Sequence, residues 1–173
     1  FKLLSYNIMG FDGATRKDGK NPILTYLKES GADILCLQEY ATGGSSHHLS
    51  QKDVNLELKA YPYHRIHTVG RGKGHTNRIA CYSKFPILSA RILNYPSEYN
   101  GSVIYEVKIG GDTLTLINNH LESNKLTKAD KVVYEDMLKS PEKEKVKSGV
   151  RLLIRKLAEA SAIRAPQADT IAH

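Results

Sequence analysis

Three polar residues follow apolar runs of the sequence and have side chains suited to phosphate chemistry. Asn7 lies near the end of FKLLSYNI, Glu39 directly follows DILCLQ, and His120 directly follows LTLINN. If these runs are strands, their ends at one edge of a sheet would hold the three side chains on a rigid frame. A carboxylate is a ligand that Mg²⁺ prefers, and an imidazole can donate a hydrogen bond or transfer a proton. The pattern therefore predicts a phosphate site with a metal-binding carboxylate.

The elements that would position these side chains are strands. A strand covered on both faces shows nearly continuous apolar residues, whereas a half-exposed strand alternates. The Gly110-Gly111 pair followed by Asp112 predicts a hairpin turn before the last strand. We expect strands within FKLLSYNIMG, GADILCLQEY, Pro62–Val69, RIACYSKFPI, Ala90–Tyr95, Ser102–Lys108 and LTLINNHLES.

Helical spacing and end signals predict helices among these strands. One covers residues 21–30, with Pro22 in its first turn, and a short one follows Ser50 and ends at Leu58. A third begins at 140–142, and Pro166 is expected to break or kink it near Ala165 before a further helical stretch. Its apolar stripe consists of Val146, Val150, Leu153, Ile154 and Leu157. Strands with interleaved helices predict a layered α/β or α+β fold.

Length and composition bound the class of protein. The chain has 173 residues, 40% of them apolar and 25% charged, as in one soluble globular domain. These values exclude a disordered polyampholyte, a collagen-like repeat and a disulfide-dense mini-protein. No apolar run approaches the roughly 20 residues of a membrane span. Cys36 and Cys81 lie in predicted buried strands, so we expect packing residues, with a bridge only if those strands are neighbours.

Net charge favours anionic partners. The chain holds 25 Lys and Arg against 18 Asp and Glu, a formal charge of +7. Nucleic acid, phosphorylated small molecules and lipid headgroups all fit a basic surface. The sequence begins at Phe1 without an initiator Met or signal-peptide pattern, so we expect that the natural start was removed. The compartment stays unknown, with a secreted or periplasmic location left open.

The chain resembles the endonuclease/exonuclease/phosphatase superfamily, the metal-dependent phosphoesterases of the pancreatic-deoxyribonuclease type. The resemblance rests on five short motifs that occur in the family's order and span most of the chain. Asn7 and Glu39 lie in the first two motifs, and His120 lies in the fourth. The motifs are SYNI, DILCLQE, NRIACYSKFPI, LTLINNHLES and IRAPQAD.

This resemblance implies a four-layer α-β-β-α sandwich with its active site at one edge of two packed sheets. It implies Mg²⁺-dependent hydrolysis of a phosphoester, with Mn²⁺ as an alternative ion. By the resemblance Glu39 is the metal ligand, and Asn7 orients the ion or a phosphate oxygen. His120 would donate a hydrogen bond to a phosphate oxygen or act in proton transfer. We expect helix packing or salt bridges, not catalysis, for Arg164 and Gln167.

Two family motifs do not occur in the sequence. The family continues with a Gly-Asp-x-Asn strand and ends with an Asp-His pair, and neither is present in the 173 residues. We therefore expect residues 1–173 to form the N-terminal part of one domain whose C-terminal part is missing. A sandwich with one incomplete sheet would expose a large apolar surface, which soluble monomers avoid. The chain alone is accordingly expected to be inactive.

Substrate and catalysis leave alternatives open. A phosphodiesterase or nuclease is the leading interpretation, a lipid or inositol-phosphate phosphatase or a sphingomyelinase-like enzyme the second. A non-catalytic binding module on the same fold is the third. Downstream Gly-Asp-x-Asn and Asp-His motifs would favour an enzyme over a binding module.

Other polar features are assigned no site. GRGKG lacks the spacing of a P-loop, so we expect a basic hairpin loop whose Arg71 and Lys73 contact substrate at most electrostatically. His64 and His67 are three residues apart, so a strand would turn them to opposite faces and prevent a shared metal. His47-His48 carries no specific signal.

Overall fold

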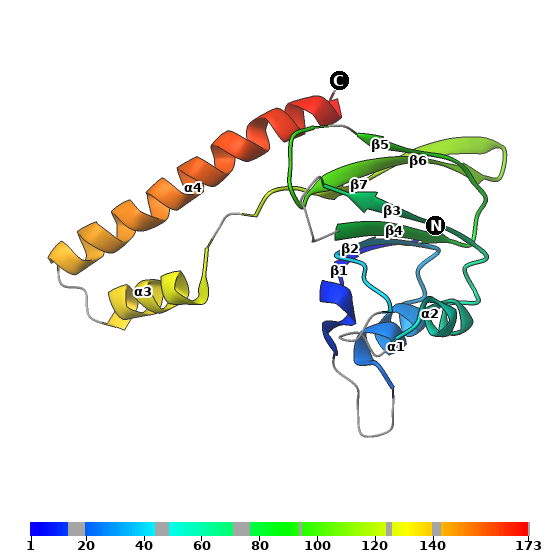
Figure 1. The fold of residues 1–173 in the computed structure, drawn as a ribbon, viewed down its shortest axis with the longest axis horizontal. Coiled ribbons are helices and arrows are strands. Elements are labelled where there is room, and N and C mark those ends of the chain that lie inside the picture. The colour runs from blue at the N-terminus through cyan, green and yellow to red at the C-terminus, as the bar shows by residue number, and fades with distance from the viewer. Residues whose placement is uncertain are drawn as a thin grey trace. The chain divides into compact units, whose positions relative to one another are not determined.

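The computed structural model describes residues 1–13, 20–43, 49–70, 77–93, 95–123, 126–139 and 143–172. Its elements fall into two units, Phe1–His120 and Leu121–His173, which are drawn in Figure 1. The first unit contains two β-sheets and two α-helices, and the second contains two α-helices.

The first sheet has the strand order β1-β2-β4-β3. Strand β1 (Leu3–Asn7) runs parallel to β2 (Ile34–Gln38), and helix α1 (Pro22–Glu29) lies between them in sequence. Strand β4 (Asn77–Ser83) runs antiparallel to both β2 and β3 (Tyr63–Val69). Every residue of β2 is buried, which confirms that its continuous apolar run is a strand covered on both faces.

The second sheet is an antiparallel meander with the order β5-β6-β7. It consists of β5 (Ile87–Leu93), β6 (Gly101–Ile109) and β7 (Asp112–His120). The turn between β6 and β7 is Gly110-Gly111, as predicted, and Gly110 has a φ of 59°, which glycine adopts without steric cost. Strand β6 is paired on both sides and supplies most of the buried residues of this sheet.

The segment RIACYSKFPI is divided between the two sheets, so the prediction of a single strand is wrong. Strand β4 ends at Ser83 in the first sheet, and β5 begins at Ile87 in the second. The Ser83 side chain accepts the backbone N–H of Phe85 at 2.9 Å, and Pro86 has no N–H to continue the ladder. A local turn and a proline thus move the chain from one sheet to the other.

The two sheets and two helices form three successive layers in the first unit. Helices α1 and α2 (Gln51–Glu57) lie on one side of the first sheet, and the second sheet lies on the other (Figure 1). Leu24, Leu27 and Val54 belong to the core between helices and sheet, whereas Val103 and Val107 belong to the core between the sheets. The layered α+β prediction is confirmed, and Ser50 caps α2 as expected.

Residues of the first sheet divide between these two cores by strand alternation. His64 stacks on Tyr82 in the helix-side core, whereas His67 lies near Tyr105 in the inter-sheet core, so the two histidines point to opposite faces as predicted. Cys36 and Cys81 are direct partners on neighbouring strands, yet both are free and buried. The hydrogen bond to Cys36 and burial raise the pKa of the Cys81 thiol, which therefore packs as a neutral group.

The second unit consists of helices α3 (Lys128–Lys139) and α4 (Lys143–Ala172). Helix α3 has no counterpart in the sequence analysis, and the expected helix start at 140–142 lies outside the described residues. Helix α4 continues through Pro166, so the expected break is wrong: a proline removes one backbone hydrogen bond, and the neighbouring turns continue the helix. Among the described residues, the helices are too short or too polar to cross a bilayer.

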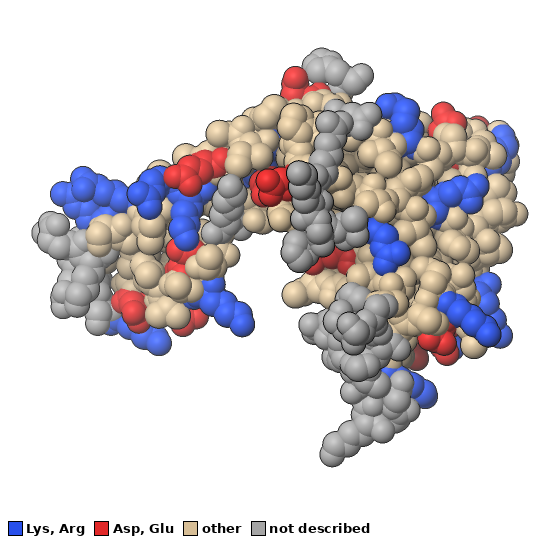
Figure 2. All heavy atoms as spheres, viewed as in Figure 1, with Lys and Arg blue, Asp and Glu red and all other residues tan. Residues whose placement is uncertain are grey.

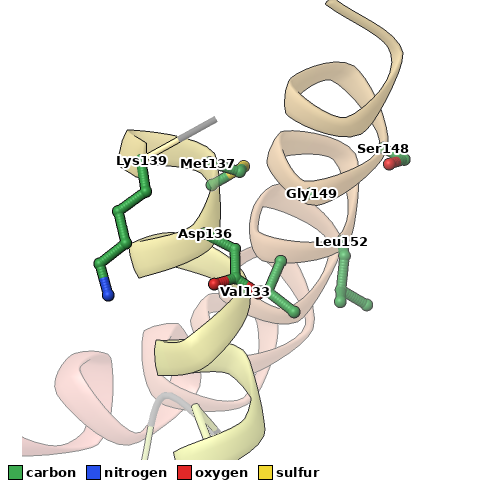
Figure 3. Close-up of a pocket in the computed structure, with 7 residues that line it drawn as sticks. All are labelled: Val133, Asp136, Met137, Lys139, Ser148, Gly149 and Leu152. Atoms are coloured by element: carbon green, nitrogen blue, oxygen red, sulfur yellow. The ribbon is translucent and has the colours of Figure 1, made fainter. Parts of the chain in front are cut away.

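Two contacts join α3 to α4. Figure 3 shows Met137 and Val133 of α3 beside Gly149 and Leu152 of α4, and an added Cβ at Gly149 would collide with Met137. Near the start of α3, both carboxylate oxygens of the buried Asp130 accept hydrogen bonds from the ammonium group of Lys156, at 2.6 and 2.7 Å. Asp130 also accepts the backbone N–H of Thr127 at 2.6 Å, which stabilises the first turn of the helix.

We predict that acid weakens the contact between α3 and α4. The Lys156 hydrogen bonds, followed by those of Thr127, lower the pKa of Asp130 from 3.8 to about 2. Because the folded pKa is the lower one, this carboxylate stabilises the unit above pH 4, and its contribution is lost as the pH falls towards 2. The difference in unfolding free energy between the native protein and Asp130→Asn should therefore disappear over this range.

The control for this experiment is Asp136→Asn, which alters an exposed carboxylate on the same helix. Its difference in unfolding free energy from the native protein serves as the reference for removing a carboxylate from α3. A constant difference for Asp130→Asn as the pH falls towards 2 would contradict the assigned contact.

A second prediction concerns the close approach of β6 to β3. Gly101 is buried, and a Cβ at this position would lie 2.5 Å from the Cβ of Val69. Gly101→Ala should therefore destabilise the protein by about 1–3 kcal/mol through overpacking, measured by denaturant unfolding. Gly111→Ala places its methyl group in open space, and should change the stability by no more than about 0.5 kcal/mol. Equal effects of the two substitutions would refute this account.

Candidate functional site

The side chains of Asn7, Glu39 and His120 meet where three strands end. The Asn7 side-chain N–H donates to Oε1 of Glu39 at 2.8 Å, and Nε2 of His120 lies 3.3 Å from the same oxygen. Strands β1 and β2 are parallel, so Asn7 and Glu39 come to one edge of the first sheet, whereas His120 ends β7 of the second. All three residues predicted from the sequence are thus brought together, and their catalytic and metal-binding roles stay predictions.

The backbone around Glu39 leaves the strand in an uncommon conformation. Glu39 has a φ of 51° and Met9 a φ of 47°, both in the left-handed region that costs a non-glycine residue about 1–2 kcal/mol. Hydrogen bonds between the two segments hold this arrangement: Ile8 N–H donates to Gln38 O at 3.0 Å, and Gly10 N–H donates to Glu39 O at 2.8 Å. The short 3₁₀ helix η1 (Met9–Gly13), which the sequence analysis did not predict, supplies the second donor.

A buried pair of amides joins the two sheets next to the site. Nε2 of Gln38 donates to Oδ1 of Asn118 at 2.6 Å, and both side chains are buried. The Asn118 amide group donates in turn to the carbonyl of Ala80 at 3.2 Å. Gln38 immediately precedes Glu39, and Asn118 lies two residues before His120 on the same face of β7. This link therefore fixes the position of the Glu39 carboxylate relative to the His120 imidazole.

Asn77 is a further polar residue of the site that sequence reasoning missed. Its side-chain amide nitrogen lies 2.9 Å from Nδ1 of His120, on the side of the ring opposite Glu39, and donates to the carbonyl of Tyr99 at 2.9 Å. Asn77 begins the motif NRIACYSKFPI, but nothing in that motif indicates a contact with a histidine 43 residues away. Only the packing of β4 against the second sheet reveals it.

The chain beyond Glu39 is anchored by Arg78. The Tyr40 backbone N–H donates to the Arg78 carbonyl at 2.9 Å, and the Arg78 guanidinium donates to the carbonyls of Tyr40 and Thr42 at 3.2 and 3.3 Å. The same guanidinium lies 5.6 Å from the centre of the Tyr40 ring. These contacts prevent the segment that carries Glu39 from swinging away from the sheet edge.

The donor set fits a divalent cation held by one protein carboxylate. The Glu39 side chain is 39% exposed and that of His120 is 18% exposed, so the carboxylate is accessible from solvent. Mg²⁺ is commonly bound by one or two carboxylates, with water and substrate phosphate as the other ligands. Within the described residues no three His, Cys, Asp or Glu side chains come together as a closed metal centre. Glu39 is the residue that would hold such an ion.

The remaining sequence predictions fall elsewhere. Arg71, Lys73, His47 and His48 lie outside the described residues. His64 and His67 point to opposite faces of the first sheet and share no ligand position. Gln167 accepts the backbone N–H of Glu122 at 3.0 Å within the second unit.

Comparisons with known proteins agree with the layered fold. The model of the Endonuclease/Exonuclease/phosphatase family matches residues 4–162. A 5'-tyrosyl-DNA phosphodiesterase of Caenorhabditis briggsae is 27% identical over 123 residues, which are 70% of this chain and 33% of that protein. The endonuclease/exonuclease/phosphatase structure from Beutenbergia cavernae DSM 12333 superposes with a TM-score of 0.58 and 15% identity, covering 89% of this chain and 43% of that one. The chain thus spans about a third to less than half of these relatives.

We predict that Gln38 and Asn118 act as one energetic unit. Gln38→Leu leaves the buried Oδ1 of Asn118 without its 2.6 Å donor, and should cost about 1–3 kcal/mol of stability. Adding Asn118→Leu should cost less than the sum of the two single effects, because the unpaired partner is then removed. Denaturant unfolding of both single variants and the double variant measures this coupling.

Asn119→Ala is the control, since Asn119 is exposed on the same strand. Its effect should be additive with Gln38→Leu. Additive effects of Gln38→Leu and Asn118→Leu would show that the amide pair does not couple the sheets.

Proposed function

The chain belongs to the endonuclease/exonuclease/phosphatase family, and on that premise we propose that its site serves the Mg²⁺-dependent hydrolysis of phosphodiesters in nucleic acid. The observation that carries this proposal is the convergence of Glu39, Asn7 and His120 from three strands of two sheets, with contacts of 2.8 and 3.3 Å. Unlinked surface residues would not share one carboxylate oxygen in this way. Family membership supports phosphoester hydrolysis in general, and the ion and the substrate are our proposal.

Each of the three side chains has a role in this proposal. Glu39 holds the cation through its carboxylate, and Asn7 orients that carboxylate through its 2.8 Å hydrogen bond. When bound, Mg²⁺ or Mn²⁺ would polarise the phosphoryl group and offset the charge that develops on its oxygens. Nε2 of His120 lies 3.3 Å from the same carboxylate oxygen and would donate a hydrogen bond to a phosphate oxygen, which would stabilise the same developing charge.

Further groups are required to activate the attacking water. The sequence has no Gly-Asp-x-Asn motif and no Asp-His pair, the family motifs expected to fill that role. We therefore propose that residues 1–173 bind the phosphate but do not turn over substrate on their own. We propose that a further part of the domain supplies the remaining groups.

Two observations favour nucleic acid as the substrate class. The relative from C. briggsae is named as a phosphodiesterase of DNA, and the formal charge of +7 favours a polyanion. On the face drawn in Figure 2, Lys and Arg are dispersed among Asp and Glu, so the attraction would be diffuse there. A phosphatase of lipids or inositol phosphates and a sphingomyelinase-like enzyme share the same three residues, and the substrate panel below separates them. A binding module would bind a phosphoester without hydrolysing it.

The test is hydrolysis by the full-length natural protein of plasmid DNA, an inositol phosphate, sphingomyelin and a chromogenic phosphodiester. We expect cleavage of the phosphodiesters with Mg²⁺ or Mn²⁺ and none with chelator. Glu39→Gln should lower kcat at least about 100-fold, because the amide loses the charge that holds the cation. His120→Ala should lower kcat by about 10²–10⁴-fold. Glu57→Gln, which alters the exposed pair between Glu57 of α2 and Lys28 of α1, should retain activity.

Four results would contradict parts of this proposal. Turnover that persists in chelator would exclude a metal-dependent site. Preference for sphingomyelin or an inositol phosphate would reassign the substrate class. Binding of DNA without hydrolysis of any substrate would identify a binding module, and turnover by the isolated 173 residues would refute the need for further groups.

A further inference from the structure

We infer that Asn77 is a positioning residue that holds the neutral imidazole of His120 with its proton on Nε2. His120 thereby presents an N–H donor, and not a basic nitrogen, to the site. The inference concerns only where the ring carries its proton, and it deepens the proposed function, on which its catalytic consequence rests. It follows from the donors and acceptors that surround the Asn77 amide.

The orientation of the Asn77 side chain is set by two backbone groups. Its Oδ1 accepts the backbone N–H of Arg78 at 2.8 Å, and its Nδ2 donates to the backbone carbonyl of Tyr99 at 2.9 Å. A backbone N–H can only donate and a carbonyl oxygen can only accept. Rotating the amide by 180° would place two donors against each other and two acceptors against each other. The amide nitrogen is therefore the atom that faces His120.

This orientation determines the tautomer of the histidine. The Asn77 nitrogen lies 2.9 Å from Nδ1 of His120, and an amide NH₂ group has no lone pair with which to accept a hydrogen bond. Nδ1 must therefore accept with its own lone pair. A neutral imidazole carries a single proton, so that proton lies on Nε2. Nε2 in turn lies 3.3 Å from Oε1 of Glu39, which is an acceptor. This contact also favours a proton on Nε2.

The tautomer decides between the two roles that the sequence left open for His120, which are hydrogen-bond donation to a phosphate oxygen and proton transfer. A general base needs an unprotonated nitrogen facing the substrate, but in this arrangement the nitrogen on the Glu39 side of the ring carries the N–H. The lone pair of Nδ1 points away from the site and is occupied by Asn77. His120 is therefore a hydrogen-bond donor to a phosphate oxygen at the start of the reaction, and another group must accept the proton of the attacking water.

The surroundings make this constraint rigid. His120 is the register partner of Gly101, whose missing side chain leaves the space that Val69 fills. Asn77 is the register partner of Val69, so the same contact between β3 and β6 supports both side chains. The Tyr99 carbonyl belongs to the segment just before β6, so Asn77 joins the first sheet to β7 of the second sheet and to the loop that leads into β6. Neither ring nor amide can rotate without breaking a bond between the sheets.

The experiment is long-range ¹H–¹⁵N NMR of the histidine rings in the full-length protein with chelator, at a pH where the rings are neutral. We expect the His120 ring to show a protonated Nε2 and an unprotonated Nδ1. In Asn77→Asp the facing carboxylate oxygen accepts instead of donating, so Nδ1 should become protonated, while Nε2 still faces the Glu39 carboxylate. Asn55→Asp is the matched control, because Asn55 bonds Gln51 and Tyr82 away from the site and should leave His120 unchanged.

The native spectrum alone can overturn the inference, even if Asn77→Asp does not fold: a proton on Nδ1 excludes it. An Nδ1 that stays unprotonated in a folded Asn77→Asp protein also excludes it. Kinetics give a second readout, since Asn77→Asp should lower kcat about 10–100-fold at constant KM, as for other residues that orient a site histidine. The NMR result does not require activity, so an inactive protein with Nε2 protonated would refute the proposed function and leave this inference intact.

Discussion

The buried hydrogen bond between Gln38 and Asn118 is the contact on which the arrangement of the site depends. It joins strands of two different sheets at 2.6 Å, in a region where water cannot substitute for a missing partner. Two packed apolar sheet faces could slide over one another at little cost, since dispersion contacts are not directional. A buried amide pair permits only one register, because every other register leaves its polar atoms unpaired. The apolar core holds the sheets together, and this pair aligns them.

That alignment brings three ordinary residues, Asn7, Glu39 and His120, into contact. Glu39 follows β2, the strand of Gln38, and His120 ends β7, the strand of Asn118. A shift between the sheets would therefore separate the carboxylate from the imidazole. The left-handed backbone at Glu39 is retained because flanking hydrogen bonds fix it, as is common where a residue is held for chemistry. Asn77 completes the arrangement by binding the far side of the imidazole. The site is thus a property of the interface between the sheets.

The sequence predicted well those features that depend on local periodicity and turn chemistry. Three such features depend on a few adjacent residues each, and the structure confirms them. They are the buried strand that precedes Glu39, the Gly110-Gly111 hairpin and the Ser50 cap. Two errors share a cause. RIACYSKFPI was expected to form one strand, and Pro166 to break or kink a helix; the single strand and the break are wrong, because each rested on a local signal without its surroundings. A crossing between sheets and a proline within a long helix are decided by the contacts of neighbouring segments.

The sequence by itself determined which residue types stand at the strand ends, and these types already limit the chemistry to a carboxylate, an amide and an imidazole. It also determined the family, through short motifs in a fixed order. Tertiary structure alone decided that Gln38 meets Asn118 across 80 residues and that Asn77 meets His120 across 43. Such pairs produce no periodic pattern in the amino-acid sequence, because the direction of a side chain across two packed sheets depends on register and twist. The tautomer that we infer for His120 follows from that packing.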